Sequence, residues 1–107
     1  MVVRLTQQEQ TDIAEAARCL LPAGSRVLLF GSRTDDRRRG GDIDLLIEAP
    51  APMSAQQAVA LRTQLAARLY RSLGERRIDI LVAPAGEADD RLVVAEARRY
   101  GLEVVRI

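Results

Sequence analysis

The pattern of apolar and polar residues predicts helices that alternate with strands. Capping-box sequences begin at Thr6 and Ser54, and apolar residues recur at helical spacing after each of them. Short apolar runs that end at Gly or Pro are typical of buried strands. The predicted helices cover residues 7–21, 33–39, 55–73 and 89–100, and the predicted strands cover residues 26–30, 42–48, 77–83 and 102–107. This order predicts a layered α/β or α+β domain, spanning residues 1–107, with helices packed on a small sheet.

The same periodicity assigns side chains to the core. In the helix over residues 55–73 the expected core contacts are Val59, Leu61, Leu65, Leu69 and Leu73. The last helix carries Leu92, Val93, Ala95 and Ala97. Cys19 is the single cysteine, so no intrachain disulfide can form, and its spacing favours a buried structural thiol over a reactive one.

Composition narrows the class of protein. The 107 residues are 48% apolar and 29% charged, which is typical of a globular domain. One Phe, two Tyr and no Trp leave an aliphatic core. No apolar run approaches the roughly 20 residues that span a bilayer, and no signal-peptide pattern begins the chain, so the expected location is the cytoplasm. A net charge of +1 provides no field that would attract nucleic acid, which is therefore not an expected partner.

Two missing residue types limit the chemistry. The chain contains no His, which excludes a histidine base or metal ligand. All sixteen basic residues are Arg, which excludes Schiff-base chemistry and a lysine-dependent phosphate loop. Carboxylates, hydroxyls, arginines and bound metal remain available for catalysis.

A glycine and two aspartates suggest where that chemistry lies. Gly31 and Ser32 follow a strand, and a turn at that position offers backbone N–H groups to an anion. Nine residues separate Ser32 from Asp42, and Asp44 follows two residues later. Two carboxylates at this spacing project from one face of a strand and repel each other unless a cation lies between them. Taken singly, each feature is also compatible with an ordinary turn or a solvated strand start.

Asp79 is the candidate for a third carboxylate, because it interrupts the apolar run of another strand. Glu48 shares the face of Asp44, but it lies about 13 Å further along the strand, too far for metal ions that sit roughly 4 Å apart. The alternative for Asp79 is an edge-strand residue paired with Arg76 or Arg77. Together, the turn, the aspartate pair and Asp79 favour a site for phosphate and divalent metal, for which Mg²⁺ suits the oxygen ligands.

These residues resemble a known family. The pattern is Gly-Ser, a spacer, Asp-x-Asp and a third Asp on a later strand, and it is similar to the signature of minimal nucleotidyltransferases, small members of the DNA polymerase beta-like superfamily. The resemblance covers about residues 26–83, and its most specific parts are Leu28-Leu29-Phe30-Gly31-Ser32-Arg33 and Gly41-Asp42-Ile43-Asp44-Leu45-Leu46-Ile47. One departure is the spacer between Ser32 and Asp42, which has nine residues where the family usually has ten. The residues after Arg33, Thr34-Asp35-Asp36, also differ from the small residue and glycine that are common there.

The resemblance implies a fold and roles for individual residues. The implied fold is the α+β fold of polymerase beta-like nucleotidyltransferases, with a small mixed sheet of about four strands flanked by helices. Gly31 and Ser32 would hold the β- and γ-phosphates of a nucleoside triphosphate, and Arg33 is the better candidate for a further phosphate contact. Asp42 and Asp44 would bind two Mg²⁺ ions, while Asp79 would share one ion and face the attacking hydroxyl. A functional role for Arg37, Arg38 and Arg39 is less favoured than a solvated loop.

The resemblance also implies a partner. Larger relatives carry a second domain for the acceptor, whereas small ones are often antitoxins encoded beside a small helical toxin, and some transfer AMP from ATP to that toxin. The favoured function is therefore Mg²⁺-dependent transfer of AMP from ATP to a hydroxyl on a partner protein. Two alternatives stay open: a non-catalytic antitoxin with the same fold, and a small-molecule nucleotidyltransferase that completes its site as a homodimer.

Overall fold

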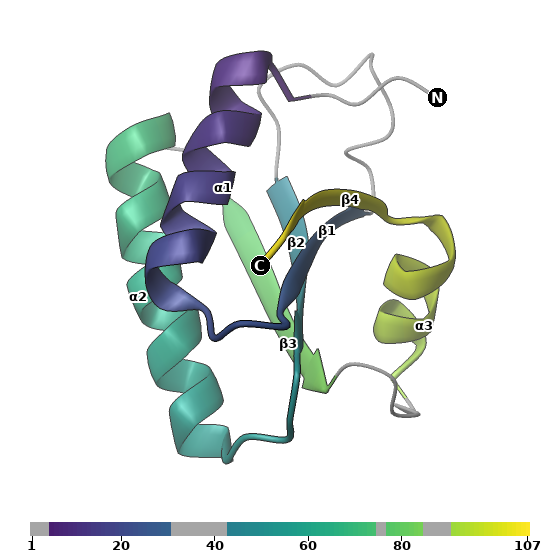
Figure 1. Cartoon of the computed structure of the whole chain (residues 1–107). Coiled ribbons are helices and arrows are strands. Elements are labelled where there is room, and N and C mark those ends of the chain that lie inside the picture. Colours follow the sequence, from purple (N-terminus) through teal and green to yellow (C-terminus); the bar gives the residue numbers. More distant parts are fainter. Residues whose placement is uncertain (1–4, 31–42, 75–76, 85–90) are drawn as a thin grey trace.

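The fold is a sheet covered by helices on both faces, as the computed structural model shows (Figure 1). The structure describes residues 5–30, 43–74, 77–84 and 91–107. In these ranges the elements are α1 (Gln7–Leu20), β1 (Arg26–Phe30), β2 (Ile43–Ala49), α2 (Ala55–Leu73), β3 (Ile78–Pro84), α3 (Leu92–Tyr100) and β4 (Leu102–Arg106). The predicted helix over residues 33–39 and the predicted start of the last helix near residue 89 lie outside the described residues.

The strands are ordered β3-β2-β1-β4 across a four-stranded mixed sheet. β1 runs antiparallel to both of its neighbours, whereas β2 and β3 are parallel. Parallel neighbours need a crossover connection, and α2 supplies it. The predicted α+β fold with a small mixed sheet is therefore confirmed.

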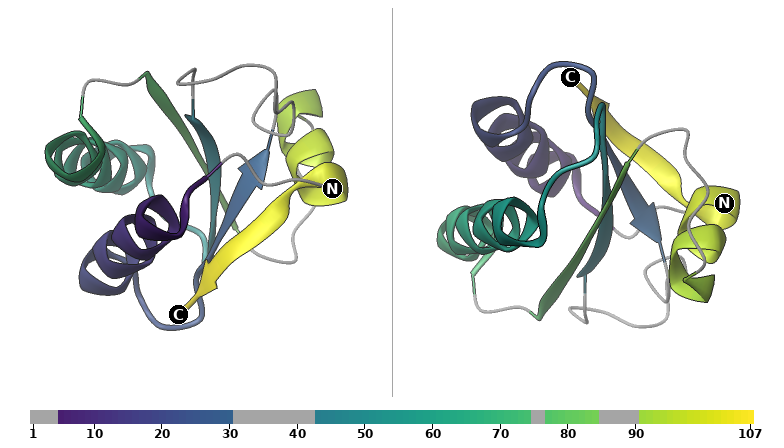
Figure 2. Two further views of the ribbon diagram at one scale, coloured as in Figure 1. Left: turned by 90° about the horizontal axis from the view of Figure 1, so that it is seen from above. Right: turned by 90° about the horizontal axis from the view of Figure 1, so that it is seen from below.

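The helices pack on opposite faces of the sheet (Figure 2). α1 and α2 cover one face, where Val27, Leu29, Leu45 and Ile47 belong to the larger core cluster. α3 covers part of the other face, where Leu28, Phe30, Leu46, Ala83, Val94 and Ala97 form a smaller cluster. The inner strands contribute to both clusters, so the prediction of strands buried on both faces is confirmed for β1.

Both predicted capping boxes are present. The Thr6 hydroxyl accepts a hydrogen bond from the Glu9 N–H at 3.0 Å, and the Glu9 carboxylate accepts one from the Thr6 N–H at 2.8 Å. Ser54 and Gln57 form the same pair of bonds at the start of α2. Gly74 ends α2 with a φ of 82°, a conformation that favours glycine. None of the described helices has the length and apolarity that crossing a bilayer requires.

Several core assignments need correction. Leu65 and Leu69 are buried as predicted, but Val59 is 48% exposed because it lies at the edge of the buried arc of α2. In α3 the residues against the sheet are Val94 and Ala97, while Leu92 is 84% exposed and Ala95 also faces outward.

Cys19 is a further correction, because it is exposed rather than buried. The buried face of α1 is formed by Ile13, Ala16 and Ala17. At 3.6 residues per turn, Cys19 lies well to the side of that face.

Candidate nucleotide and metal site

Asp44 and Asp79 are brought together by the parallel pairing of β2 and β3. The two residues are direct partners in the strand register. Neighbouring strands lie about 4.8 Å apart, and paired residues on parallel strands project from the same face. The prediction that Asp79 comes from a strand next to that of Asp44 is therefore confirmed.

Strand alternation determines which face these carboxylates occupy. Ile43 and Leu45 flank Asp44 and belong to the core beneath α1 and α2. Ile78 and Ile80 flank Asp79 and lie in the same core. Asp44 and Asp79 consequently lie on the opposite face, which they share with Leu46 and α3.

The end of β1 lies beside Asp44, on the side of β2 away from Asp79. Phe30, the last residue of β1, pairs with Asp44 in the antiparallel register. Gly31 and Ser32 follow Phe30 directly in the chain, and Asp42 directly precedes Ile43. The Ile43 N–H donates a hydrogen bond to the Arg77 carbonyl oxygen at 2.9 Å, which ties the beginnings of β2 and β3 together.

Four predicted site residues, Gly31, Ser32, Arg33 and Asp42, lie outside the described residues. The described residues contain no group of three or more Asp, Glu, Cys or His side chains that could hold a metal ion. They do contain the pair Asp44 and Asp79, whose oxygen atoms are the ligand type that Mg²⁺ prefers. Two like charges on paired residues favour a cation between them, so the residues present fit a divalent metal.

Asp79 also forms an ion pair with Arg77. The Arg77 Nε lies 3.8 Å from Oδ2 of Asp79, and their side chains are 74% and 54% exposed. Such an exposed ion pair contributes little stability, at most about 1 kcal/mol. The pairing with Arg77 that the sequence offered as an alternative is thus present alongside the register with Asp44.

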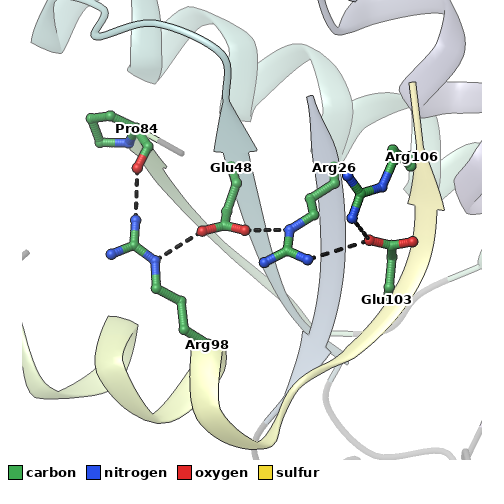
Figure 3. A network of polar contacts seen from close by, with 6 residues as sticks. All are labelled: Arg26, Glu48, Pro84, Arg98, Glu103 and Arg106. Atoms are coloured by element: carbon green, nitrogen blue, oxygen red, sulfur yellow. Dashed lines mark hydrogen bonds and ion pairs between the residues drawn. The ribbon is translucent and has the colours of Figure 1, made fainter. Parts of the chain in front are cut away.

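Glu48 belongs to a separate network of ion pairs at the far end of β2. It is only 3% exposed and accepts hydrogen bonds from Arg26 on β1 and, at 2.8 Å, from Arg98 on α3 (Figure 3). Arg98 also donates to the Pro84 carbonyl oxygen at 2.7 Å. The hydrogen bond to Glu48 raises the pKa of Arg26 above its ordinary value. Glu48 therefore joins three elements, which agrees with its exclusion from the metal site on the basis of distance.

The sequence did not predict a groove of about 660 Å³ between α2 and β3. Asp79 lines it together with Arg62 and Tyr70 of α2. Helical spacing does place residues 59, 63, 66 and 70 on one side of the predicted helix. It does not reveal that β3 is an edge strand, and the groove exists because no further described strand covers that edge.

Comparison with known proteins identifies similar structures. No family model and no curated protein sequence matches the chain. A structure of the toxin–antitoxin MntA-HepT contains a chain that matches with a TM-score of 0.64 and 18% identity, over 95% of this chain and 74% of that one. A toxin–antitoxin structure with AMP-PNP matches with a TM-score of 0.65 and 19% identity, over 92% of this chain and 73% of that one. This chain therefore shares the α+β fold of the matched chains in these toxin–antitoxin structures.

Proposed function

We propose that this protein is a Mg²⁺-dependent nucleotidyltransferase that transfers AMP from ATP to a hydroxyl of a partner protein, as the antitoxin of a toxin–antitoxin pair. The observation that carries the proposal is the pairing of Asp44 with Asp79 beside the end of β1. The resemblance assigns phosphate binding to Gly31 and Ser32, which follow that end. The likeness to a toxin–antitoxin structure with AMP-PNP supports both a nucleotide and a partner protein.

The residues have distinct roles in this proposal. Asp42, Asp44 and Asp79 would hold Mg²⁺, which neutralises phosphate charge and lowers the pKa of a bound hydroxyl. Gly31, Ser32 and Arg33 would hold the triphosphate through backbone N–H groups, a hydroxyl and a guanidinium. Asp79 would accept the proton of the acceptor hydroxyl on a carboxylate oxygen. The acceptor oxygen would form a bond to the α-phosphorus, and pyrophosphate would leave.

The test is transfer of label from α-labelled ATP to the helical protein that we expect the adjacent reading frame to encode. Label should appear on that protein with the wild type, and Asp44→Asn should abolish it. Glu103→Gln is a matched control, because it removes a carboxylate from β4 at the opposite edge of the sheet. Equal labelling by wild type and Asp44→Asn would remove catalysis from the proposal.

A non-catalytic antitoxin is the second candidate, and the ion pair between Arg77 and Asp79 favours it. In that case Asp79 is a surface residue, and protection of cells depends on contact alone. Co-expression with the toxin separates the two functions. The catalytic function predicts that Asp44→Asn loses protection, whereas the non-catalytic one predicts that this variant still neutralises the toxin.

A further inference from the structure

The α2–β3 groove combines an open cavity with exposed apolar side chains. Its floor includes Ile80 and Leu81 of β3, and Ala66 and Ala67 belong to its α2 wall. Tyr70 also lines the groove and is 44% exposed. Val59 is 48% exposed and lies on the same side of α2 as Tyr70, about three turns away.

The charge of α2 indicates what kind of molecule the groove fits. The 19 residues of α2 include Arg62, Arg68 and Arg71 but no Asp or Glu. All three arginines are exposed, and none forms an ion pair with another residue in the part of the chain that the structure describes. Arg62 stands on the wall of the groove itself. An occupant that carries acidic residues beside its apolar side would complement this wall.

We propose that the α2–β3 groove is the docking surface for an amphipathic helix of a partner protein whose flanking residues are acidic. A helix places apolar residues at spacings of three and four, which suits an apolar groove between a helix and a strand. Acidic residues beside that apolar stripe would meet Arg62, and complementary charge selects such a partner against a basic one.

Two other occupants fit less well. A second copy of this chain that docked through the same surface would bring Arg62 of one α2 close to Arg62 of the other without an acidic residue on either helix, which is repulsive. Nucleic acid is favoured by several cations around stacked aromatic residues. The groove instead has one arginine, one aspartate, one aromatic residue and several aliphatic side chains in its lining.

The groove also adjoins the candidate site, because Asp79 lines it. If the proposed function holds, a docked partner would have its acceptor hydroxyl near the carboxylate assigned to receive the proton. Docking itself rests on the groove and its charge and requires neither ATP nor metal.

The experiment is site-specific photocrosslinking in the cells from which the protein comes. A photoreactive amino acid replaces Ala67 in the full chain, and mass spectrometry identifies the crosslinked segment. The matched control has the same amino acid at Leu92, which is 84% exposed on α3, on the opposite face of the sheet. We expect a crosslink from position 67, absent from position 92, to a helical segment of another protein that carries Asp or Glu beside its apolar side.

Charge reversal then tests the chemistry of docking. Arg62→Glu should lower the crosslink yield by about tenfold or more, the change that a loss of 1.4 kcal/mol of binding free energy produces. Arg68→Glu makes the same change on α2 outside the groove lining and should lower the yield much less. Circular dichroism of both variants confirms that they fold.

The proposal is overturned by a crosslink to a second copy of this chain, by a crosslink to nucleic acid or by no crosslink at position 67. Equal crosslink yields with and without the Arg62→Glu substitution would overturn it as well. Because crosslinking needs no nucleotide, an inactive Asp44→Asn variant that still crosslinks would reject catalysis and leave the docking surface in place.

Discussion

Asp79 is the residue whose surroundings are most informative, because it has both a carboxylate and an arginine as neighbours. Its register partner is Asp44, which favours a cation, and Arg77 lies 3.8 Å away, which neutralises charge without one. An ordinary surface ion pair requires Arg77 alone. A catalytic carboxylate requires the pairing with Asp44. Substitution of Asp79 itself and of Arg77 separates the two roles.

We expect Asp79→Asn to lower transfer by roughly 10² or more, the usual scale for loss of a general base. The change is nearly isosteric and should leave ATP binding largely intact, because Asp42 and Asp44 remain. Single-turnover transfer from labelled ATP measures the rate. Arg77→Gln is the matched control, because it removes the ion pair and keeps the carboxylate. If Asp79→Asn retained a rate within a few-fold of wild type, Asp79 would be a surface residue.

Nucleotide binding should depend on metal, because the triphosphate and the aspartates repel each other. We expect Asp42→Asn and Asp44→Asn each to weaken the binding of ATP in Mg²⁺. Titration calorimetry in Mg²⁺ and in EDTA measures this dependence. Equal affinity in the two buffers would contradict the assignment of these aspartates as metal ligands.

At the scale of secondary-structure elements, Glu48 connects β2 to β1 and α3 through Arg26 and Arg98. Its side chain is 4% exposed, whereas those of the two arginines are 32% and 24% exposed. Loss of the carboxylate removes the negative charge that both arginines share, but Arg98 keeps its bond to the Pro84 carbonyl oxygen and Arg26 its contact with Glu103, and both retain some access to water. Substitution of Glu48 should therefore lower the free energy of unfolding by less than the loss of one partner of a fully buried ion pair does.

We expect Glu48→Gln to lower the free energy of unfolding by about 2 kcal/mol. Urea unfolding followed by circular dichroism measures the change. Glu103→Gln is the comparison, since its side chain is 38% exposed and its ion pairs are superficial, so its cost should be clearly smaller than that of Glu48→Gln. Similar small costs for both variants would show that Glu48 does not hold α3 on the sheet.

Glu103 also predicts a dependence on pH. A hydrogen bond from Arg106, and to a lesser extent one from Arg26, lowers the pKa of Glu103 below its ordinary value. A carboxyl whose pKa is lower in the folded state stabilises the fold above its ordinary pKa, about 4.3, and loses that contribution as pH falls through the folded value. The difference in urea midpoint between wild type and Glu103→Gln should therefore shrink from pH 7 to pH 3. A constant difference would contradict this.

The elements were largely predictable from sequence, because capping boxes and strand runs are local signals. Thr6 and Ser54 begin their helices as expected. Local periodicity gives an apolar arc but not the neighbour that covers it, so Val59 and Leu92 were wrongly assigned to the core. For the site, the adjacency of Asp44 and Asp79 was expected from the sequence. The proximity of Arg62 and Tyr70 to Asp79 was not, because it follows only from the packing of α2 against an edge strand.

At the scale of the whole molecule, two surfaces meet at Asp79. One is the face of β2 and β3 that carries the aspartates, and the other is the α2–β3 groove. The interactions expected at the two surfaces differ. The aspartate face needs a cation between like charges, whereas the groove needs apolar contact with opposite charges at its border. A molecule arranged in this way should bind nucleotide and partner under separable conditions.

We therefore expect the complex with the protein crosslinked at position 67 to form equally in Mg²⁺ and in EDTA, whereas ATP binding is lost in EDTA. The complex should weaken as salt is raised, because Arg62 is exposed and its attraction to acidic residues is screened.

Without the partner the chain should be monomeric, since paired α2 helices repel; with it, the interface should bury at least about 1,000 Å². Light scattering measures both states. A homodimer of the isolated chain, or a complex that dissociates in EDTA, would mean that metal or a second copy, rather than the groove, holds the assembly together.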